Sequence, residues 1–260
     1  MSLLDRRGFA LVLVAAWALA DLGEFAEARC LAAEALAIAT TLDHPHSIIF
    51  AAMGAGTVDL RRGEAREALA VLERAHAVCR TVDLPAVLIE LAGPLASAYA
   101  ATGRSKEAIA LLEEAVAQAI ALRHGVGHIL RTGGLAEAYL AAARVEDAVP
   151  LAQLYVQVAR MVSLRGAEAW ALHLLADVEI HRENPDAEAA MQALAAALVI
   201  AEELGMRPLA ARCQLTRAAL DVALGQPVDA CRAATLALAQ FRMLDMPRFA
   251  AQAEAMLRRS

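Results

Sequence analysis

YAATGRSKEAIALLEEAVAQA, residues 99–119, contains a tyrosine, a glycine four residues later, and alanines five and twelve residues after that glycine. The glycine of this stretch is Gly103, and two counterparts precede it at intervals of forty residues, Gly63 and Gly23. A glycine just past a helix end can take the left-handed conformation that closes the helix. The spacing therefore predicts a repeated unit of two helices joined by a glycine turn. These equivalent positions of successive units form a column. Further along the chain it falls at Ala143, near Asn184-Pro185 after the spacing lengthens by two residues, and at Gly225.

A second column marks the other turn of each unit. Its members are Pro45, Pro85, Gly125, Gly166, Pro208 and Pro247. Proline suits the first position of a helix because the N–H it lacks has no partner there anyway. Asp43, Asp83 and Asp245 lie two residues before their prolines, and we predict that they cap the following helices.

A third column predicts how the two helices of a unit pack. Small residues recur near the start of each second helix and again seven residues later, where Tyr155 is the exception. Alanine at both levels lets the paired helices approach closely, and stacked pairs bury their apolar faces against their neighbours. The two sets are Ala28, Ala68, Ala108, Ala148, Ala190 and Ala230, and Ala35, Ala75, Ala115, Ala197 and Ala237.

This pattern resembles the tetratricopeptide repeat, whose small, Tyr-like, Gly, Ala and Ala positions are matched by Ala96, Tyr99, Gly103, Ala108 and Ala115. Two features depart from it: the period is about 40 residues rather than about 34, and the tyrosine position is degenerate. The long period is similar to the helical-repeat regions of bacterial multidomain ATPase regulators and of adenylate or guanylate cyclase-linked signalling proteins. The stretches EELGMRPLAARCQL and FRMLDMPRFAAQAEAMLRR resemble the C-terminal end of the cyclase-linked group.

We therefore predict an all-α protein, a right-handed α-solenoid (superhelix) of six tetratricopeptide-like helix-turn-helix repeats with a C-terminal capping helix. The prediction treats residues 1–260 as a single solenoid domain. Its repeats are expected at about 8–44, 45–84, 85–124, 125–165, 166–207 and 208–246, with the capping helix at 247–258.

Composition and charge exclude several classes of function. The net charge is −6 and the basic residues are scattered, whereas a nucleic-acid-binding protein needs a concentrated basic face. The apolar run of residues 8–20 is shorter than the roughly 20 residues that a membrane-spanning helix needs. The four cysteines have no metal-ligand or CxxC spacing. They are predicted to be buried thiols in a reducing compartment, and the protein is predicted to be cytoplasmic.

The two ends of the chain differ in polarity. The last helix, PRFAAQAEAMLRR, has a polar side, whereas residues 8–20 are apolar on every side. Terminal repeats of a solenoid need a polar outer face, so this N-terminal edge is expected to be covered by further repeats, by an upstream domain, or by a second copy in a homodimer. The chain is accordingly interpreted as a C-terminal fragment of a longer protein, with Met1-Ser2-Leu3 as a possible cloning leader.

No catalytic or metal-binding constellation stands out. His173, Asp177 and His181 share a helix face two turns long, but no further ligand is evident; His124 and His128 flank two glycines. No arrangement of nucleophile and base can be argued. The chain is predicted to be neither an enzyme nor the carrier of a cofactor or metal.

Glycines within the first helices of the central units are the more informative anomaly. Met53-Gly54, Gly93-Pro94 and Gly133-Gly134 occupy the same two columns, forty residues apart. Glycine costs about 1 kcal/mol and proline about 3 kcal/mol inside a helix. The resemblance implies that the first column faces a concave groove that holds a ligand, whereas the alternative is that small residues permit close helix crossing. The candidate groove residues are Trp17, Met53, Glu90, Gly93, Ser97, Arg131, Gly133 and Glu137.

Three functions remain open at this point. The leading one is a non-catalytic interaction scaffold that binds a protein or peptide segment, or neighbouring domains, as the repeat region of a larger signalling or transcription-regulating protein. The second is a sensor that binds a small-molecule effector in the groove. The third is self-association through residues 8–20. A peptide groove should be open and polar, whereas a sensor pocket should be closed and apolar near Gly93 and Gly133.

Overall fold

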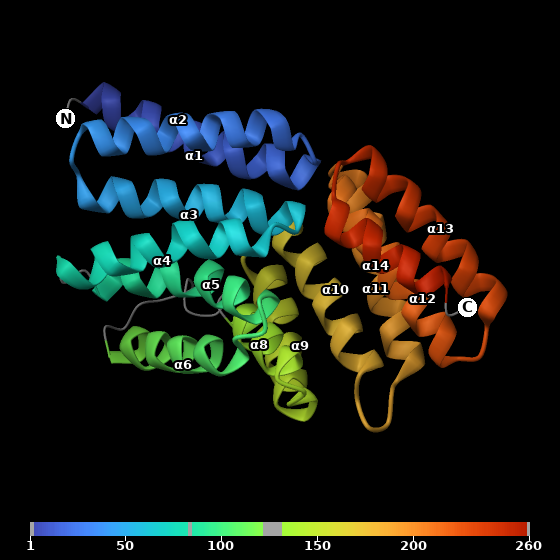
Figure 1. Ribbon diagram of the computed structural model, residues 1–260. Helices are drawn as coiled ribbons and strands as arrows, with labels where there is room; N and C mark the ends of the chain where they lie inside the picture. Colours follow the sequence, from blue (N-terminus) through green and yellow to red (C-terminus); the bar gives the residue numbers. More distant parts are fainter. Residues whose placement is uncertain (1–2, 83–84, 122–131, 259–260) are drawn as a thin grey trace. The chain divides into compact units, whose positions relative to one another are not determined.

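The computed structural model describes residues 3–82, 85–121 and 132–258 (Figure 1), with side chains for residues 12–82, 86–119 and 132–258. Within these ranges the protein is built from α-helices and contains no strand. This confirms the predicted all-α repeat architecture. The chain divides into two compact units, residues 1–128 and 129–260.

The first unit consists of helices that pair in chain order. Each helix packs against the next, and α1, α3 and α5 also pack against one another, so the first helices of successive pairs form one layer (Figure 1). The helices are α1 (Leu3–Leu22), α2 (Phe25–Thr41), α3 (Pro45–Arg62), α4 (Ala65–Thr81), α5 (Pro85–Ala101) and α6 (Ser105–Ala121).

The second unit repeats this arrangement. Its first helices, α8, α10, α12 and α14, again contact one another in sequence, while α9, α11 and α13 pack against the helices on either side of them in the chain. The helices are α8 (Thr132–Ala141), α9 (Val145–Met161), α10 (Arg165–Ile180), α11 (Ala187–Glu203), α12 (Arg207–Ala223), α13 (Pro227–Met243) and α14 (Pro247–Leu257).

The turn columns have the backbone conformations that end helices. Gly23, Gly63, Gly103 and Gly225 have φ between 69° and 95°, and Ala143, in the same column, has φ 56°. Ala143 shows that the turn geometry is imposed by the packing of the two helices even where a side chain makes it costly.

The prediction for the aspartates before the prolines was wrong. Asp43 and Asp245 have φ 46° and 52° and end the preceding helices, so they do not cap the following ones. His44 caps α3 instead, because its Nδ1 accepts a hydrogen bond from the Ser47 backbone N–H at 3.3 Å. Asp83 lies outside the described residues.

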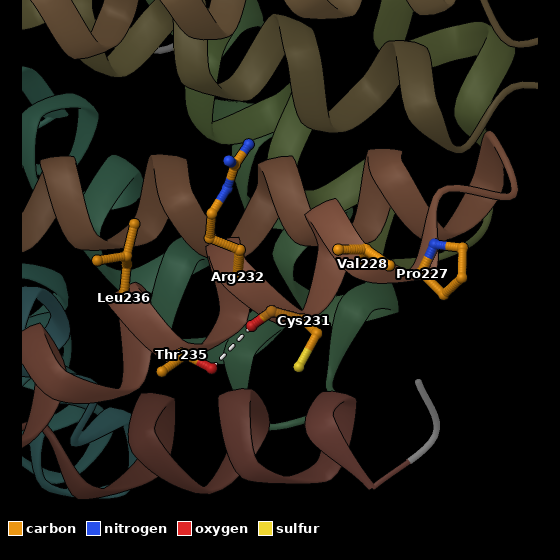
Figure 2. A pocket seen from close by; sticks show the side chains of 6 residues that line it. All are labelled: Pro227, Val228, Cys231, Arg232, Thr235 and Leu236. Atoms are coloured by element: carbon orange, nitrogen blue, oxygen red, sulfur yellow. Dashed lines mark hydrogen bonds between the residues drawn. The ribbon is translucent and has the colours of Figure 1, made fainter.

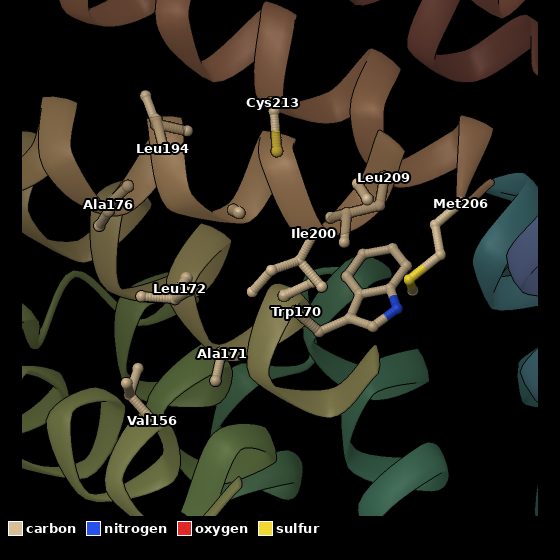
Figure 3. Packing of buried hydrophobic residues seen from close by; sticks show 14 of the residues in the cluster. Val156, Trp170, Ala171, Leu172, Ala176, Leu194, Ile200, Met206, Leu209 and Cys213 are labelled. Atoms are coloured by element: carbon tan, nitrogen blue, oxygen red, sulfur yellow. The ribbon is translucent and has the colours of Figure 1, made fainter. Parts of the chain in front are cut away.

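The alanine columns form the contact line between paired helices. All eleven predicted alanines are buried, none with more than 2% of its surface exposed. A hydrophobic cluster of the second unit extends this contact line with bulkier side chains, and Figure 3 shows Trp170 beside Ile200, Leu209 and Met206. Alanine thus sets the spacing of the helices, and a few large side chains fill the space between pairs.

Two kinds of contact are found at the degenerate tyrosine position. In two units an arginine from the next turn stacks on the ring, Arg104 on Tyr99 and Arg144 on Tyr139, each 4.3 Å from the ring centre. In another unit the position carries Asp221, whose carboxylate accepts a hydrogen bond from Arg217 Nε at 2.8 Å. Different side chains therefore make different stabilising contacts at the same repeat position, near the end of the first helix.

The cysteine prediction holds for two residues and fails for two. Cys79 and Cys213 are buried, and burial raises the pKa of the Cys213 thiol to about 12. Cys30 and Cys231 are exposed, because they lie on sides of α2 and α13 that no neighbouring helix covers. Across the described ranges, no helix is both long enough and apolar enough to span a bilayer.

Asp59, at the same repeat position in α3, is a partly buried carboxyl with weak charge compensation. Its side chain is 14% exposed, and the Arg29 guanidinium approaches it only to 3.8 Å. Burial raises its pKa from 3.8 to about 6; Arg29 and Arg62 oppose the rise, while Glu64 and Glu67 add to it.

We expect the stability of the first unit to fall as pH rises from about 4 to about 6, because the folded state holds this proton more tightly than the unfolded chain. Asp59→Asn should remove that slope and raise stability at neutral pH by roughly 1–3 kcal/mol. Urea unfolding at several pH values, followed by Trp17 fluorescence in a Trp170→Phe background, measures both effects. An unchanged slope in the Asn variant would contradict the assignment.

Candidate functional site

The eight predicted groove residues are divided between the two units. Trp17, Met53, Glu90, Gly93 and Ser97 belong to the first-helix layer of the first unit, on α1, α3 and α5. The remaining three were predicted for the next first helix. Gly133 and Glu137 lie on α8 of the second unit, and Arg131 lies outside the described residues.

The glycines of α3 serve close helix packing. A Cβ on Gly54 would collide with the Cδ1 of Leu13 on α1, and a Cβ on Gly56 would lie 2.6–2.8 Å from three carbons of Leu72 on α4. Met53, beside them, is buried. At this level the small residues allow the helices to cross closely, as the alternative interpretation expects.

Trp17 lies at the same contact between α1 and α3. Its indole Nε1 is buried without a hydrogen-bond partner and is 3.7 Å from the position of a Cβ on Gly54. The ring therefore fills the space beside the glycine, and packing accounts for it.

Gly93 on α5 differs from these glycines. A Cβ placed on it meets no heavy atom within 4 Å, and both Gly93 and Pro94 are partly exposed. Pro94 lies inside the helix, where it removes the N–H that would bond to the carbonyl four residues earlier. Two residues that weaken a helix thus stand side by side without a packing contact that requires the glycine. Glu90 and Ser97, one turn before and after, are also partly exposed.

Gly133 on α8 is buried against a ring. A Cβ there would lie 2.5 Å from Cε1 and 2.6 Å from Cδ1 of Tyr155 on α9. Tyr155 is the member of the alanine column that is not small, so the glycine compensates for the bulk of the tyrosine. Glu137, one turn further along α8, is partly exposed.

The first helices of the second unit carry polar and aromatic contacts from helix to helix. The Arg212 guanidinium on α12 lies 5.0 Å from the centre of the Trp170 ring on α10 and 5.3 Å from that of Phe249 on α14. His173 Nε2 and Thr216 Oγ1 are 3.1 Å apart between α10 and α12. These contacts tie three consecutive first helices together.

His173, Asp177 and His181 lie along α10 and at its C-terminal end, where they make other contacts. His173 is buried against Thr216, and Nδ1 of His181 lies 2.7 Å from the backbone oxygen of Asp177. Burial raises the pKa of Asp177, and the charges of His181 and Arg212 oppose that rise. Within the part of the chain that the structure describes, no group of three or more His, Cys, Asp or Glu side chains is placed to hold a metal ion.

A surface that the sequence analysis did not single out runs along α13. A shallow hollow of about 560 Å³ lies beside this helix. Figure 2 shows the side chains that line it, Pro227, Val228, Cys231, Arg232, Thr235 and Leu236. The available signal was the spacing of Val228, Leu236 and Met243, eight and seven residues apart, which places three large apolar side chains on one side of a helix. The alanine columns, on which the sequence prediction was based, lie on the opposite, buried side of the helix.

Solved structures with the same architecture are available for comparison. The TPR-like repeats of a protein described as a kinesin light chain from Podosopora anserina are 25% identical, with a TM-score of 0.51, covering 79% of this chain and 98% of that one. BtubC from P. vanneervenii is 16% identical, with a TM-score of 0.57, covering 82% and 89%.

This chain has the tetratricopeptide-repeat fold.

A third tetratricopeptide-repeat structure places such repeats within a larger protein. It is a signal transduction ATPase with numerous domains from Pyrococcus horikoshii, with a tetratricopeptide repeat sensor. It is 15% identical with a TM-score of 0.54, and the match covers 97% of this chain but 39% of that one. No family model matches the sequence, and no curated protein matches it.

Proposed function

We propose that this tetratricopeptide-type chain is a non-catalytic protein–protein interaction scaffold, the regulatory repeat region of a larger bacterial signalling or transcription-regulating protein. The larger context is supported by the Pyrococcus horikoshii ATPase, in which a tetratricopeptide repeat region occupies part of a longer chain. The proposed ligand is a polypeptide segment that lies across the first-helix layer of the first unit.

The observation that carries the proposal is the open space at Gly93. Gly54 and Gly56 of α3 and Gly133 of α8 have close neighbours at the position of a Cβ, whereas Gly93 has none within 4 Å. A glycine in a helix lets another backbone approach closely, and Pro94 beside it adds to the cost of the helix. A segment lying against α5 gives a reason for both residues.

A selection from a phage-displayed library of random linear peptides tests this proposal. Peptides selected on the wild-type chain should bind the Gly93→Leu variant at least about tenfold more weakly, because the leucine occupies the contact surface of the peptide. Ala117→Leu, at an exposed position of α6 in the same unit, should leave binding unchanged. Equal affinity for both variants would refute the groove at α5.

A sensor function is the second candidate, favoured by the tetratricopeptide repeat sensor of the Pyrococcus horikoshii ATPase. A small effector bound at this site should raise the melting temperature of the wild-type chain in proportion to the logarithm of its concentration, and Gly93→Leu should abolish the rise. A thermal-shift screen of nucleotides, amino acids and sugars distinguishes this function from peptide binding.

Self-association through the N-terminal edge is the third candidate. Val14 and Ala18, four residues apart on α1, are both exposed, whereas Leu13, Ala16 and Ala20 are buried. Val14→Asp should then reduce any dimer mass measured by light scattering.

A further inference from the structure

We draw no further inference here: the strongest candidate, the exposed apolar side of α13 at Val228, Leu236 and Met243, carries none, because nothing in the structure shows what covers it.

Discussion

Gly133→Leu should destabilise the second unit by about 3 kcal/mol, near the upper end of the usual cost of overpacking a core. The first side-chain atom already falls 2.5 Å from the ring of Tyr155. The aromatic ring is rigid and belongs to the contact between α8 and α9, so relief requires the two helices to separate. Unfolding by urea, followed by the fluorescence of Trp170 in a Trp17→Phe background, reports the second unit alone.

Gly93→Leu is the matched control, because it makes the same change at the same repeat position. Its Cβ meets no atom within 4 Å, and leucine favours a helix over glycine by about 1 kcal/mol. Its stability, followed by Trp17 fluorescence in a Trp170→Phe background, should therefore equal or slightly exceed that of the parent chain. Similar losses in both variants would show that the two glycines share a packing role.

The second large effect is expected from Arg217→Met. Asp221 is 1% exposed, and Arg217 Nε, 2.8 Å from its carboxylate, supplies the opposing charge. The Arg217 side chain is itself 43% exposed. Its removal leaves the buried Asp221 carboxylate without its hydrogen-bonding partner, which should cost roughly 1–3 kcal/mol. Urea unfolding followed by Trp170 fluorescence in the Trp17→Phe background measures the loss.

Two further variants show whether burial is the cause of that loss. Arg232→Met breaks a pair of equal length with Asp229, but both side chains are largely exposed, so the cost should stay below about 1 kcal/mol. Adding Asp221→Leu to Arg217→Met should recover most of the lost stability, because no charge then remains buried. An equal cost for the two arginine variants would contradict this account.

Much of the repeat architecture was predictable from spacing alone. Gly103 and Ala108 act through the backbone conformation and the size of their own residue, and both properties are local. The positive φ of the turn column and the burial of the alanine columns followed directly. The aspartates before the prolines were misjudged because a residue between two helices can serve either one, and the tight turn favoured the left-handed conformation at Asp43.

The candidate site was less predictable, because its residues differ in what lies opposite them. Gly93 and Gly133 are equivalent in the repeat, and Gly54 lies one residue further along its own unit. The sequence has no means of showing that Gly54 faces Leu13 and Gly133 faces Tyr155, whereas Gly93 faces open space. The apolar side of α13 was overlooked for a related reason, since a helix that is apolar on two sides shows no preference for either.

The sequence by itself determined the all-α fold, the alternation of first and second helices, and most of the glycine-type turns between them. These features depend on helix periodicity, small size and turn chemistry, which every unit repeats. Only the tertiary structure decided which residues that depart from the repeat pack against another helix and which lie at the surface. That distinction depends on atoms brought together from different helices, such as the ring of Tyr155 against Gly133, and no spacing along the chain records it.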